Sequence, residues 1–259
     1  MTGRQRLPCR PVVLVFAGVD PSGGAGIAAD IVAIAAQGAH ALPVISALTV
    51  QDNDRVFAVE PVAPELLRRQ AQALIAKIAI HAVKIGIPGS AANAAVIAQL
   101  IAQLRLARPD LPVVLDPVLA SGHGDVLSRD DAVMALAPLL PLTTVIVPNG
   151  PEALALGGEE NLRAQGCKHV LVTGGHGEGE VIVNRWLDSA GGERAWRWPR
   201  LPGQFHGSGC TLASAIAARL ALGEALPDAL DLAQAYCHAA LSDAYAIAPG
   251  QLMPQRFIQ

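Results

Sequence analysis

The sequence predicts an α/β protein of three layers, with a mostly parallel central sheet and helices on both faces. Short apolar runs alternate with helix-like segments along most of the chain, which is the order that builds a parallel sheet. The first run, residues 12–17, is apolar at every position, as expected of a strand buried on both faces. Loops carrying Gly, Asp and Asn follow several of these runs, and sheets of this kind bind ligands beyond the carboxyl ends of their strands.

The composition suits one large domain. Of the 259 residues, 52% are hydrophobic and 16% are charged, and no linker rich in Pro, Gly or Ser divides them. We therefore expect a single domain over residues 1–259, with residues 1–10 as a loose N-terminal extension. A net charge of −3 with scattered arginines argues against a nucleic-acid partner, and no apolar run is long enough to cross a membrane.

The strands are placed by their apolar runs and by the turns between them. A hairpin is expected around residues 188–192, because alternating segments flank a turn of polar residues and glycine. All three tryptophans lie in this hairpin, where we expect them to cover the edge of the sheet. The predicted strands are residues 12–17, 43–48, 56–59, 82–85, 112–115, 144–147, 170–173, 181–183 and 194–198.

The helices are placed by their ends. Gly38 suits a helix C-terminus, Pro64 a first helical position and Ser90 an N-cap. Residues 128–131 have the form of a capping box, and Glu152 falls in the first turn of a helix that follows Pro148 and Asn149. The predicted helices cover residues 27–37, 64–79, 91–106 and 128–140, a segment after Asn149, and a segment that begins at about residue 211.

The stretch from His206 to Thr211 is predicted to be an anion-binding turn at the start of a helix. Gly207 and Gly209 carry no Cβ, so the backbone can bend and a ligand oxygen can approach it. The amides of the first helical turn have no partner within the helix, and together with the helix dipole they bind phosphate. The alternative is a plain turn before a core helix.

Cys210 gives this turn a possible base. At a helix N-terminus a thiol with an ordinary pKa of about 8.5 is pushed toward the thiolate. Phosphoryl transfer to an alcohol needs both an anion site and a group that accepts the hydroxyl proton. A buried structural cysteine remains the alternative. The four cysteines lack metal-type spacing, which indicates reduced thiols and a cytoplasmic protein.

The two common nucleotide-binding motifs do not occur. The chain has no Gly-x-x-x-x-Gly-Lys-Ser/Thr, and the glycines after the first strand, Gly23, Gly24 and Gly26, do not have the Gly-x-Gly-x-x-Gly spacing. A Walker-type ATPase and a dinucleotide dehydrogenase are therefore not expected. The loop at residues 22–26 is expected instead to let a flat substrate lie close to the backbone.

Six motifs, in this order, resemble those of a known family. They are residues 17–30, 47–51, 84–86, 114–118, 148–152 and 206–212. The chain resembles the hydroxymethylpyrimidine/phosphomethylpyrimidine kinases of thiamine biosynthesis, a branch of the ribokinase-like superfamily, over nearly its whole length.

The resemblance implies a reaction and a set of site residues. The reaction is transfer of the γ-phosphoryl group of ATP, with Mg²⁺, to 4-amino-5-hydroxymethyl-2-methylpyrimidine and then to its monophosphate; a homodimer is also implied. The phosphoryl-binding and catalytic turn is Gly207, Ser208, Gly209 and Cys210. The pyrimidine pocket is Gly18, Asp30, Gln51, Ile87 and Val118. The nucleotide side is Asp116, Asn149, Glu152 and Thr173, of which Asn149 and Glu152 lie near Mg²⁺.

Three other functions stay open at this point. A pyridoxal kinase would share the fold and the cysteine. A pyrimidine-binding protein without catalysis is suggested by Val19 and Thr173, which depart from the usual family pattern. A hydrolase using Cys210 and His206 is a third alternative, although no orienting third residue is evident. Whether the loop at residues 121–125 closes over the substrate also stays open.

Overall fold

A sheet of nine strands runs through the computed structural model, which describes residues 9–120, 124, 127 and 131–257. The strands are β1 (Val12–Val19), β2 (His40–Gln51), β3 (Val56–Pro61), β4 (Ala82–Ile85), β5 (Val113–Leu115), β6 (Val145–Ile146), β7 (His169–Val172), β8 (Val181–Leu187) and β9 (Glu193–Pro199). The helices are α1 (Gly26–Ala36), α2 (Pro64–Ile75), α3 (Ala91–Ala107), α4 (Ala132–Leu136), α5 (Gly150–Ala155), α6 (Glu159–Ala164), α7 (Ser208–Ala221) and α8 (Leu226–Ser242), with a 3₁₀ turn at Leu140–Leu142.

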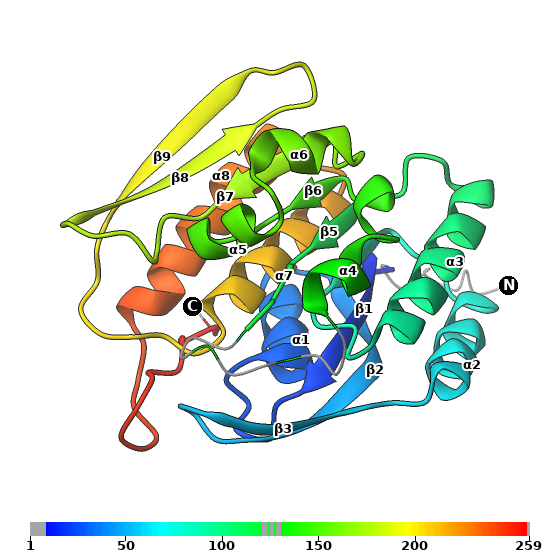
Figure 1. The fold of residues 1–259 in the computed structure, drawn as a ribbon, viewed down its shortest axis with the longest axis horizontal. Helices are drawn as coiled ribbons and strands as arrows, with labels where there is room; N and C mark the ends of the chain where they lie inside the picture. The colour runs from blue at the N-terminus through cyan, green and yellow to red at the C-terminus, as the bar shows by residue number, and fades with distance from the viewer. Residues whose placement is uncertain (1–8, 121–123, 125–126, 128–130, 258–259) are drawn as a thin grey trace, which may run out of the picture.

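The strands lie in the order β3-β2-β1-β4-β5-β6-β7-β8-β9 (Figure 1). From β2 to β7 all neighbours pair in parallel, whereas β3, β8 and β9 extend the two edges by antiparallel pairing. The predicted mostly parallel α/β sheet is therefore confirmed. Because the parallel strands all end at one edge, the loops after β1, β4, β5, β6 and β7 gather there.

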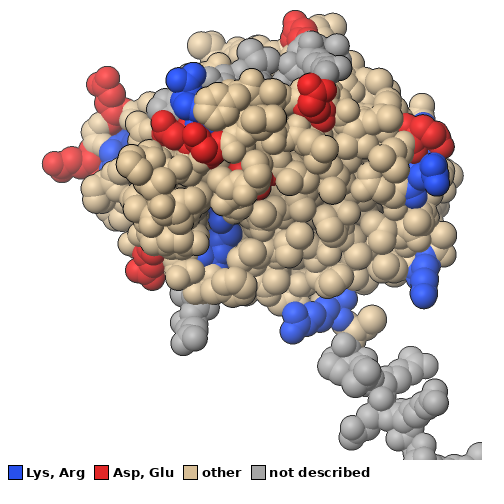
Figure 2. Space-filling view, turned by 90° about the horizontal axis from the view of Figure 1, so that it is seen from below, with Lys and Arg blue, Asp and Glu red and all other residues tan. Residues whose placement is uncertain are grey.

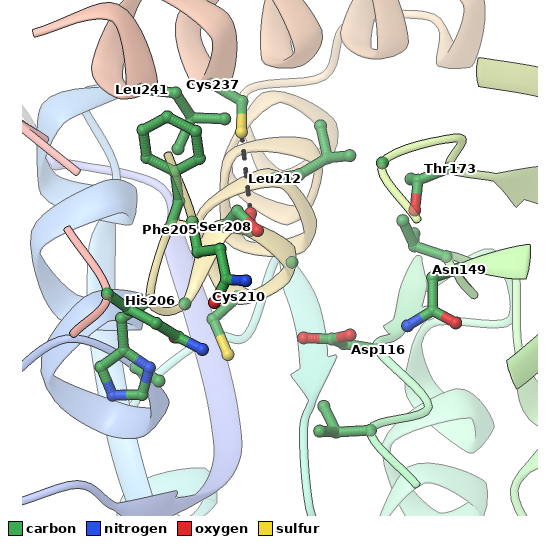
Figure 3. Close-up of a pocket in the computed structure, with 18 of the residues that line it drawn as sticks. Asp116, Asn149, Thr173, Phe205, His206, Ser208, Cys210, Leu212, Cys237 and Leu241 are labelled. Atoms are coloured by element: carbon green, nitrogen blue, oxygen red, sulfur yellow. Dashed lines mark hydrogen bonds between the residues drawn. The ribbon is translucent and has the colours of Figure 1, made fainter. Parts of the chain in front are cut away.

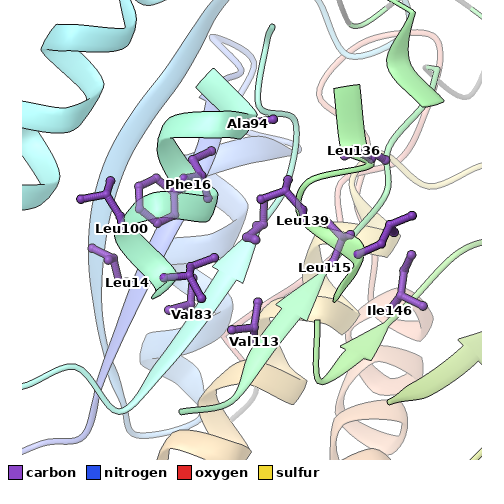
Figure 4. Close-up of a cluster of buried hydrophobic side chains, with 14 of the residues drawn as sticks. Leu14, Phe16, Val83, Ala94, Leu100, Val113, Leu115, Leu136, Leu139 and Ile146 are labelled. Atoms are coloured by element: carbon purple, nitrogen blue, oxygen red, sulfur yellow. The ribbon is translucent and has the colours of Figure 1, made fainter. Parts of the chain in front are cut away.

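Both faces of the sheet are covered by helices, as predicted. Alternate residues of β1 point to opposite faces: Leu14 and Phe16 belong to a core shared with α2, α3 and α4, while Val13, Val15 and Ala17 belong to a core shared with α1, α7 and α8. Figure 4 shows part of the first core, in which Leu14 and Phe16 lie near Leu100 of α3. Burial on both faces explains why the first run contains no polar residue.

Several element bounds differ from those predicted. The side chain of Asp131 accepts hydrogen bonds from the amides of Val133 and Met134, so α4 begins after Asp131 and ends at Leu136. The proposed cap at Ser128 lies outside the described residues. Helix α2 ends at Ile75, and α6 and α8 were not delimited from the sequence.

Charged residues do not gather on the face seen in Figure 2, which views the molecule from the side where β3 lies in Figure 1. On that face charged residues of both signs lie mostly toward the edges, and other residues cover most of the middle. Among the described residues, no helix combines the length and apolar character that a membrane span requires.

Candidate active site

A cavity of about 610 Å³ lies at the carboxyl edge of the sheet, beside the start of α7. Twelve of the thirteen predicted site residues line it; Asp30 does not. Figure 3 shows how the two sides face each other, with Ser208 and Cys210 at the start of α7 on one side and Asp116, Asn149 and Thr173 on the other. The volume is that of a pocket for a drug-sized ligand.

The turn before α7 leaves three backbone amides free. Thr211 N is the first amide of the helix to bond within it, to Gly207 O at 2.9 Å. In the described part of the chain, the amides of Ser208, Gly209 and Cys210 donate to no protein acceptor. Gly207 has a φ of 71°, and a Cβ there would lie 2.1 Å from Gly24 O. The helix start is therefore an open anion site whose shape requires glycine.

Cys210 differs from its prediction. Burial raises the pKa of its thiol to about 12, against the opposing effect of the Lys84 ammonium. The predicted shift of this thiol toward the thiolate is wrong, because the loss of solvation outweighs the effect of the helix N-terminus. The thiol and the Asp116 carboxyl lie on facing sides of the cavity (Figure 3), which both groups line.

Asp30 was predicted to bind the pyrimidine, and the structure places it beneath the cavity instead. Its carboxylate is fully buried, 2.9 Å from Lys84 Nζ, and accepts a hydrogen bond of 2.7 Å from Ser214 Oγ. Lys84 is also fully buried, and its Nζ lies 3.9 Å from Asp116 Oδ2. Burial alone would lower the pKa of Lys84, but the charges of Asp30, Cys210 and Asp116 and the hydrogen bond to Asp30 together outweigh burial and raise it. Asp30 therefore holds an ammonium ion under the site.

Asp116 closes this cluster toward the cavity. Its Oδ2 is buried and has no hydrogen-bond partner among the described residues. Burial raises the pKa of this carboxyl, and the Lys84 charge opposes the rise only in part. Buried polar atoms are rarely left unpaired unless they serve a function, so this oxygen is a candidate proton acceptor.

The loop after β1 is tied to the turn before α7. The Asp20 carboxylate accepts hydrogen bonds from the amides of Ser22 (2.8 Å) and Ala25 (2.7 Å) and pairs with His206 Nε2 at 2.8 Å. Burial alone would raise the pKa of Asp20, but these hydrogen bonds outweigh it and hold the pKa below its usual value. A Cβ on Gly24 would lie 2.0 Å from the His206 ring, so this glycine serves loop packing rather than the substrate.

Gln51 reaches the other end of the cavity from the end of β2. Its Nε2 donates to Thr49 Oγ1 at 2.7 Å, and Thr49 Oγ1 donates to Val19 O at 2.8 Å. These two hydrogen bonds fix the amide plane, and among the described residues Gln51 Oε1 accepts no hydrogen bond. Gly18 and Ile87 lie close by, since a Cβ on Gly18 would come within 2.7 Å of Ile87 Cδ1.

Asn149 and Glu152 form a capping box at the start of α5. Asn149 Oδ1 accepts from the Glu152 amide, and Glu152 Oε2 accepts from the Asn149 amide, both at 2.9 Å. Burial, aided by the charge of Asp116, raises the pKa of Glu152 to about 7. The backbones of Asn149 and Thr173 also form an isolated parallel β-bridge. The residues predicted to bind the nucleotide therefore extend to the end of β7.

The far end of the cavity contains an aromatic pair that was not predicted from the sequence. Trp198 of β9 stacks on His238 of α8 with ring centroids 4.9 Å apart, and both line the cavity. Trp198 was expected only to cover a sheet edge, whereas Trp186 and Trp196 pack on each other away from the cavity. His238 meets Trp198 because α8 packs against β9. The two residues are far apart in the sequence, so local sequence does not reveal this contact.

The phosphomethylpyrimidine kinase family matches residues 20–254 of the chain. The chain belongs to this family. The hydroxymethylpyrimidine/phosphomethylpyrimidine kinase of Rhizobium meliloti is 39% identical over 257 residues, which cover 93% of this chain and 94% of the relative. The enzyme of the same name from Streptomyces coelicolor is 37% identical over 255 residues, covering 93% of this chain and 92% of the relative.

Solved structures of vitamin kinases share the fold. A phosphomethylpyrimidine kinase from Clostridium difficile superposes with a TM-score of 0.75 at 32% identity, covering 89% of this chain and 99% of that one. A Bacillus subtilis pyridoxal kinase, determined as an ADP complex, superposes with a TM-score of 0.85 at 25% identity, covering 96% and 98%. This member of the phosphomethylpyrimidine kinase family therefore has the ribokinase-like fold and is a phosphotransferase.

Proposed function

We propose that the protein transfers the γ-phosphoryl group of ATP to the hydroxymethyl oxygen of 4-amino-5-hydroxymethyl-2-methylpyrimidine, and then a second phosphoryl group to the monophosphate formed. The observation that carries this proposal is one continuous cavity in which the free amides of Ser208, Gly209 and Cys210 lie between Gln51 and Thr173. An acceptor at one end and a nucleotide at the other would both meet this anion site. Family membership supports the choice of substrate.

Gln51 is proposed to select the pyrimidine. The bond from its Nε2 to Thr49 Oγ1 leaves Oε1 free to accept from the exocyclic amino group of the base. Gly18, Ile87 and Val118 also line this end of the cavity and offer a flat, mostly apolar surface. A pyridine ring without that amino group would leave Gln51 Oε1 without its partner.

The nucleotide is proposed to occupy the end lined by Asn149, Thr173 and the stacked rings of Trp198 and His238. Mg²⁺ prefers oxygen ligands and keeps several waters, and commonly binds through one or two carboxylates and substrate phosphates. The described residues contain no group of three acidic, histidine or cysteine ligands, so Glu152 and Asn149 would hold the ion together with water and phosphate. The ion would supply charge neutralisation at the phosphates.

The proton of the hydroxymethyl group is proposed to leave through Cys210 and Asp116. A protonated Cys210 beside the Asp116 carboxylate can pass its own proton to Asp116 and take the alcohol proton, so that one proton moves from oxygen to carboxylate. The alcohol oxygen then forms the new bond to phosphorus, and ADP leaves. Lys84 keeps a positive charge beneath the pair. The second acceptor is a phosphate that is already ionised and needs no base.

One incubation tests the proposal. Purified protein with Mg·ATP is given the hydroxymethylpyrimidine and pyridoxal at equal concentrations, and the products are followed by mass. We expect the pyrimidine mono- and diphosphates to form in sequence and faster than pyridoxal phosphate. Faster phosphorylation of pyridoxal would make the protein a pyridoxal kinase, and binding of the pyrimidine without ATP consumption would make it a binding protein.

A second copy of the chain is the proposed partner. Thr49 and Gln51 of β2 face the cavity, so the alternating residues Leu48 and Val50 face outward and are 53% and 58% exposed, near Phe57 at 67%. Burial of this apolar face by a second molecule would form a homodimer, which sedimentation at several concentrations would detect. Val50→Lys should shift the monomer–dimer equilibrium toward the monomer.

A cytoplasmic location is also proposed, and the four unpaired cysteines support it.

A further inference from the structure

The segment after α8 runs between the parts of the chain that form the site. Leu252 N donates to Gln204 O at 2.8 Å, and His206 N donates to Leu252 O at 2.9 Å, so this segment pairs with the stretch just before the phosphoryl-binding turn. The Asn53 amide donates to Pro249 O and Gln251 O, which ties the same segment to the turn after β2. The C-terminal segment is therefore placed to set the position of several site loops at once.

Arg256 is the point at which this segment reaches the two glycine loops. The residue is only 6% exposed. Its Nη2 donates to Gly24 O, and its Nε donates to Thr211 Oγ1 at 2.9 Å. Thr211 Oγ1 donates in turn to Gly207 O at 2.8 Å. One guanidinium thus connects the loop after β1 to the first turn of α7.

The same guanidinium is a buried charge that forms no ion pair within the described part of the chain. Burying a cation without an ionic partner is unfavourable, so packing alone would favour an apolar side chain here. A phosphoryl group held by the amides at the start of α7 would bring negative charge close to this cation.

The loop after β1 and the turn before α7 also approach each other closely at Gly24. Gly24 O lies so close to Gly207 that a Cβ on Gly207 would meet it at 2.1 Å. Arg256 donates a hydrogen bond to this same carbonyl. Without the guanidinium, the loop and the turn would be joined by this close backbone contact and by the Asp20–His206 pair.

We propose that Arg256 is a positioning residue for phosphoryl transfer, which clamps Gly24 to the first turn of α7 and thereby holds the amides of Ser208, Gly209 and Cys210 in place. This inference rests on the phosphoryl-binding role proposed for that turn. Arg256 does not line the cavity, so it acts through the backbone and through its charge.

Four variants test the clamp. Arg256→Met removes the guanidinium and keeps the stem, Arg256→Lys keeps the charge but not the two-pronged geometry, and Thr211→Val removes the hydroxyl between Arg256 and Gly207. The control is Arg219→Met, because Arg219 lies on α7, the helix that also carries Thr211, and binds Gln37 and Glu224 at the far end of that helix. Each protein is measured for kcat, for KM of Mg·ATP and for the rise in Tm that ADP produces.

We expect Arg256→Met to lower kcat by about 100-fold, the loss that misplacement by about 1 Å can produce, and to reduce the Tm rise with ADP. Arg256→Lys should recover part of both, and Thr211→Val should lose part of both. Arg219→Met should lower Tm without ligand and leave kcat and the ADP response unchanged. If Arg256→Met does not fold, the lysine and valine variants carry the test.

Two results would overturn the clamp. If Arg256 and Thr211 variants lose Tm but keep the wild-type kcat, KM and ADP response, the contacts are only structural. If the wild-type protein itself neither gains Tm with ADP nor transfers phosphoryl groups, the proposed function fails, and this inference fails with it. Normal wild-type activity with unaffected variants would overturn the clamp alone.

Discussion

At the scale of single residues, the proposed proton path through Cys210 and Asp116 predicts different effects on the two phosphorylation steps. Cys210→Ala should slow the first phosphorylation about 10²- to 10⁴-fold, the usual worth of a positioned base. The second phosphorylation should change far less, because the acceptor phosphate is already ionised. Asp116→Asn should show the same difference, since its carboxylate is the proposed end of the proton path. Single-turnover assays with each acceptor, read by mass, measure both steps.

A control variant separates chemistry from packing. Cys237→Ala removes a second thiol that lines the cavity and is held at Ser208 O, and it should leave the ratio of the two rates unchanged. Equal losses in both steps after Cys210→Ala would point to a packing role for that thiol and remove it from the proton path.

Thr49 is expected to influence pyrimidine binding through its hydrogen bond to Gln51. Thr49→Val removes the acceptor that orients the Gln51 amide. Losing about 1 kcal/mol of hydrogen bonding should raise the KM for the hydroxymethylpyrimidine about 5-fold, while the KM for ATP stays constant. Steady-state kinetics with each substrate varied in turn check this; a parallel rise of both KM values would contradict it.

At the scale of elements, the capping box of α5 should make stability depend on pH. Burial raises the pKa of Glu152 from its ordinary 4.5 to about 7, so the folded protein keeps this proton to a higher pH than the unfolded chain. Stability contributed by the protonated form is therefore lost as the pH rises from about 4.5 to about 7. A pKa difference of about 2.5 corresponds to at most about 3 kcal/mol.

Glu152→Gln removes this titration. Relative to the wild type, the variant should gain unfolding free energy between pH 5 and pH 8, measured by urea denaturation at each pH. Glu160→Gln, in the exposed first turn of α6, is the matched control and should follow the wild type. A Glu152→Gln curve parallel to that of the wild type would show that the carboxyl does not titrate in this range.

Elements built from local patterns were predictable, and contacts between distant elements were not. Short stretches of sequence were enough to predict β1 and β4 from their apolar runs and the turn before α7 from its glycines. These elements predicted the position of most of the residues that line the cavity. Asp30 was misplaced because the helical pattern of α1 does not tell that its buried face meets Lys84. Arg256 went unnoticed because it lies in an irregular segment without periodicity, and its partners lie 45 and 232 residues away.

At the scale of the whole molecule, the parallel sheet explains how the two substrates meet. Gln51 is the last residue of β2 near one edge of the sheet, and Trp198 lies in β9 at the other edge. The start of α7 lies between these edges, at the carboxyl ends of the parallel strands (Figure 1). Binding of each ligand should therefore change the surroundings of the residues at its own end of the cavity. The tryptophans offer a direct way to see this, because among them Trp198 alone lines the cavity in the part of the chain that the structure describes.

ADP should change the tryptophan fluorescence, and the hydroxymethylpyrimidine alone should not. Stacking or contact at Trp198 and His238 alters the surroundings of that indole, whereas Gln51 lies at the opposite end of the cavity. Trp198→Phe should abolish the ADP signal. Trp196→Phe should keep it, because the Trp196 indole donates to Asp231 and does not line the cavity. A pyrimidine-induced signal that survives Trp198→Phe would mean that the two ends are exchanged or that the hairpin moves on binding, and the arrangement of ligands proposed above would have to be reversed or redrawn.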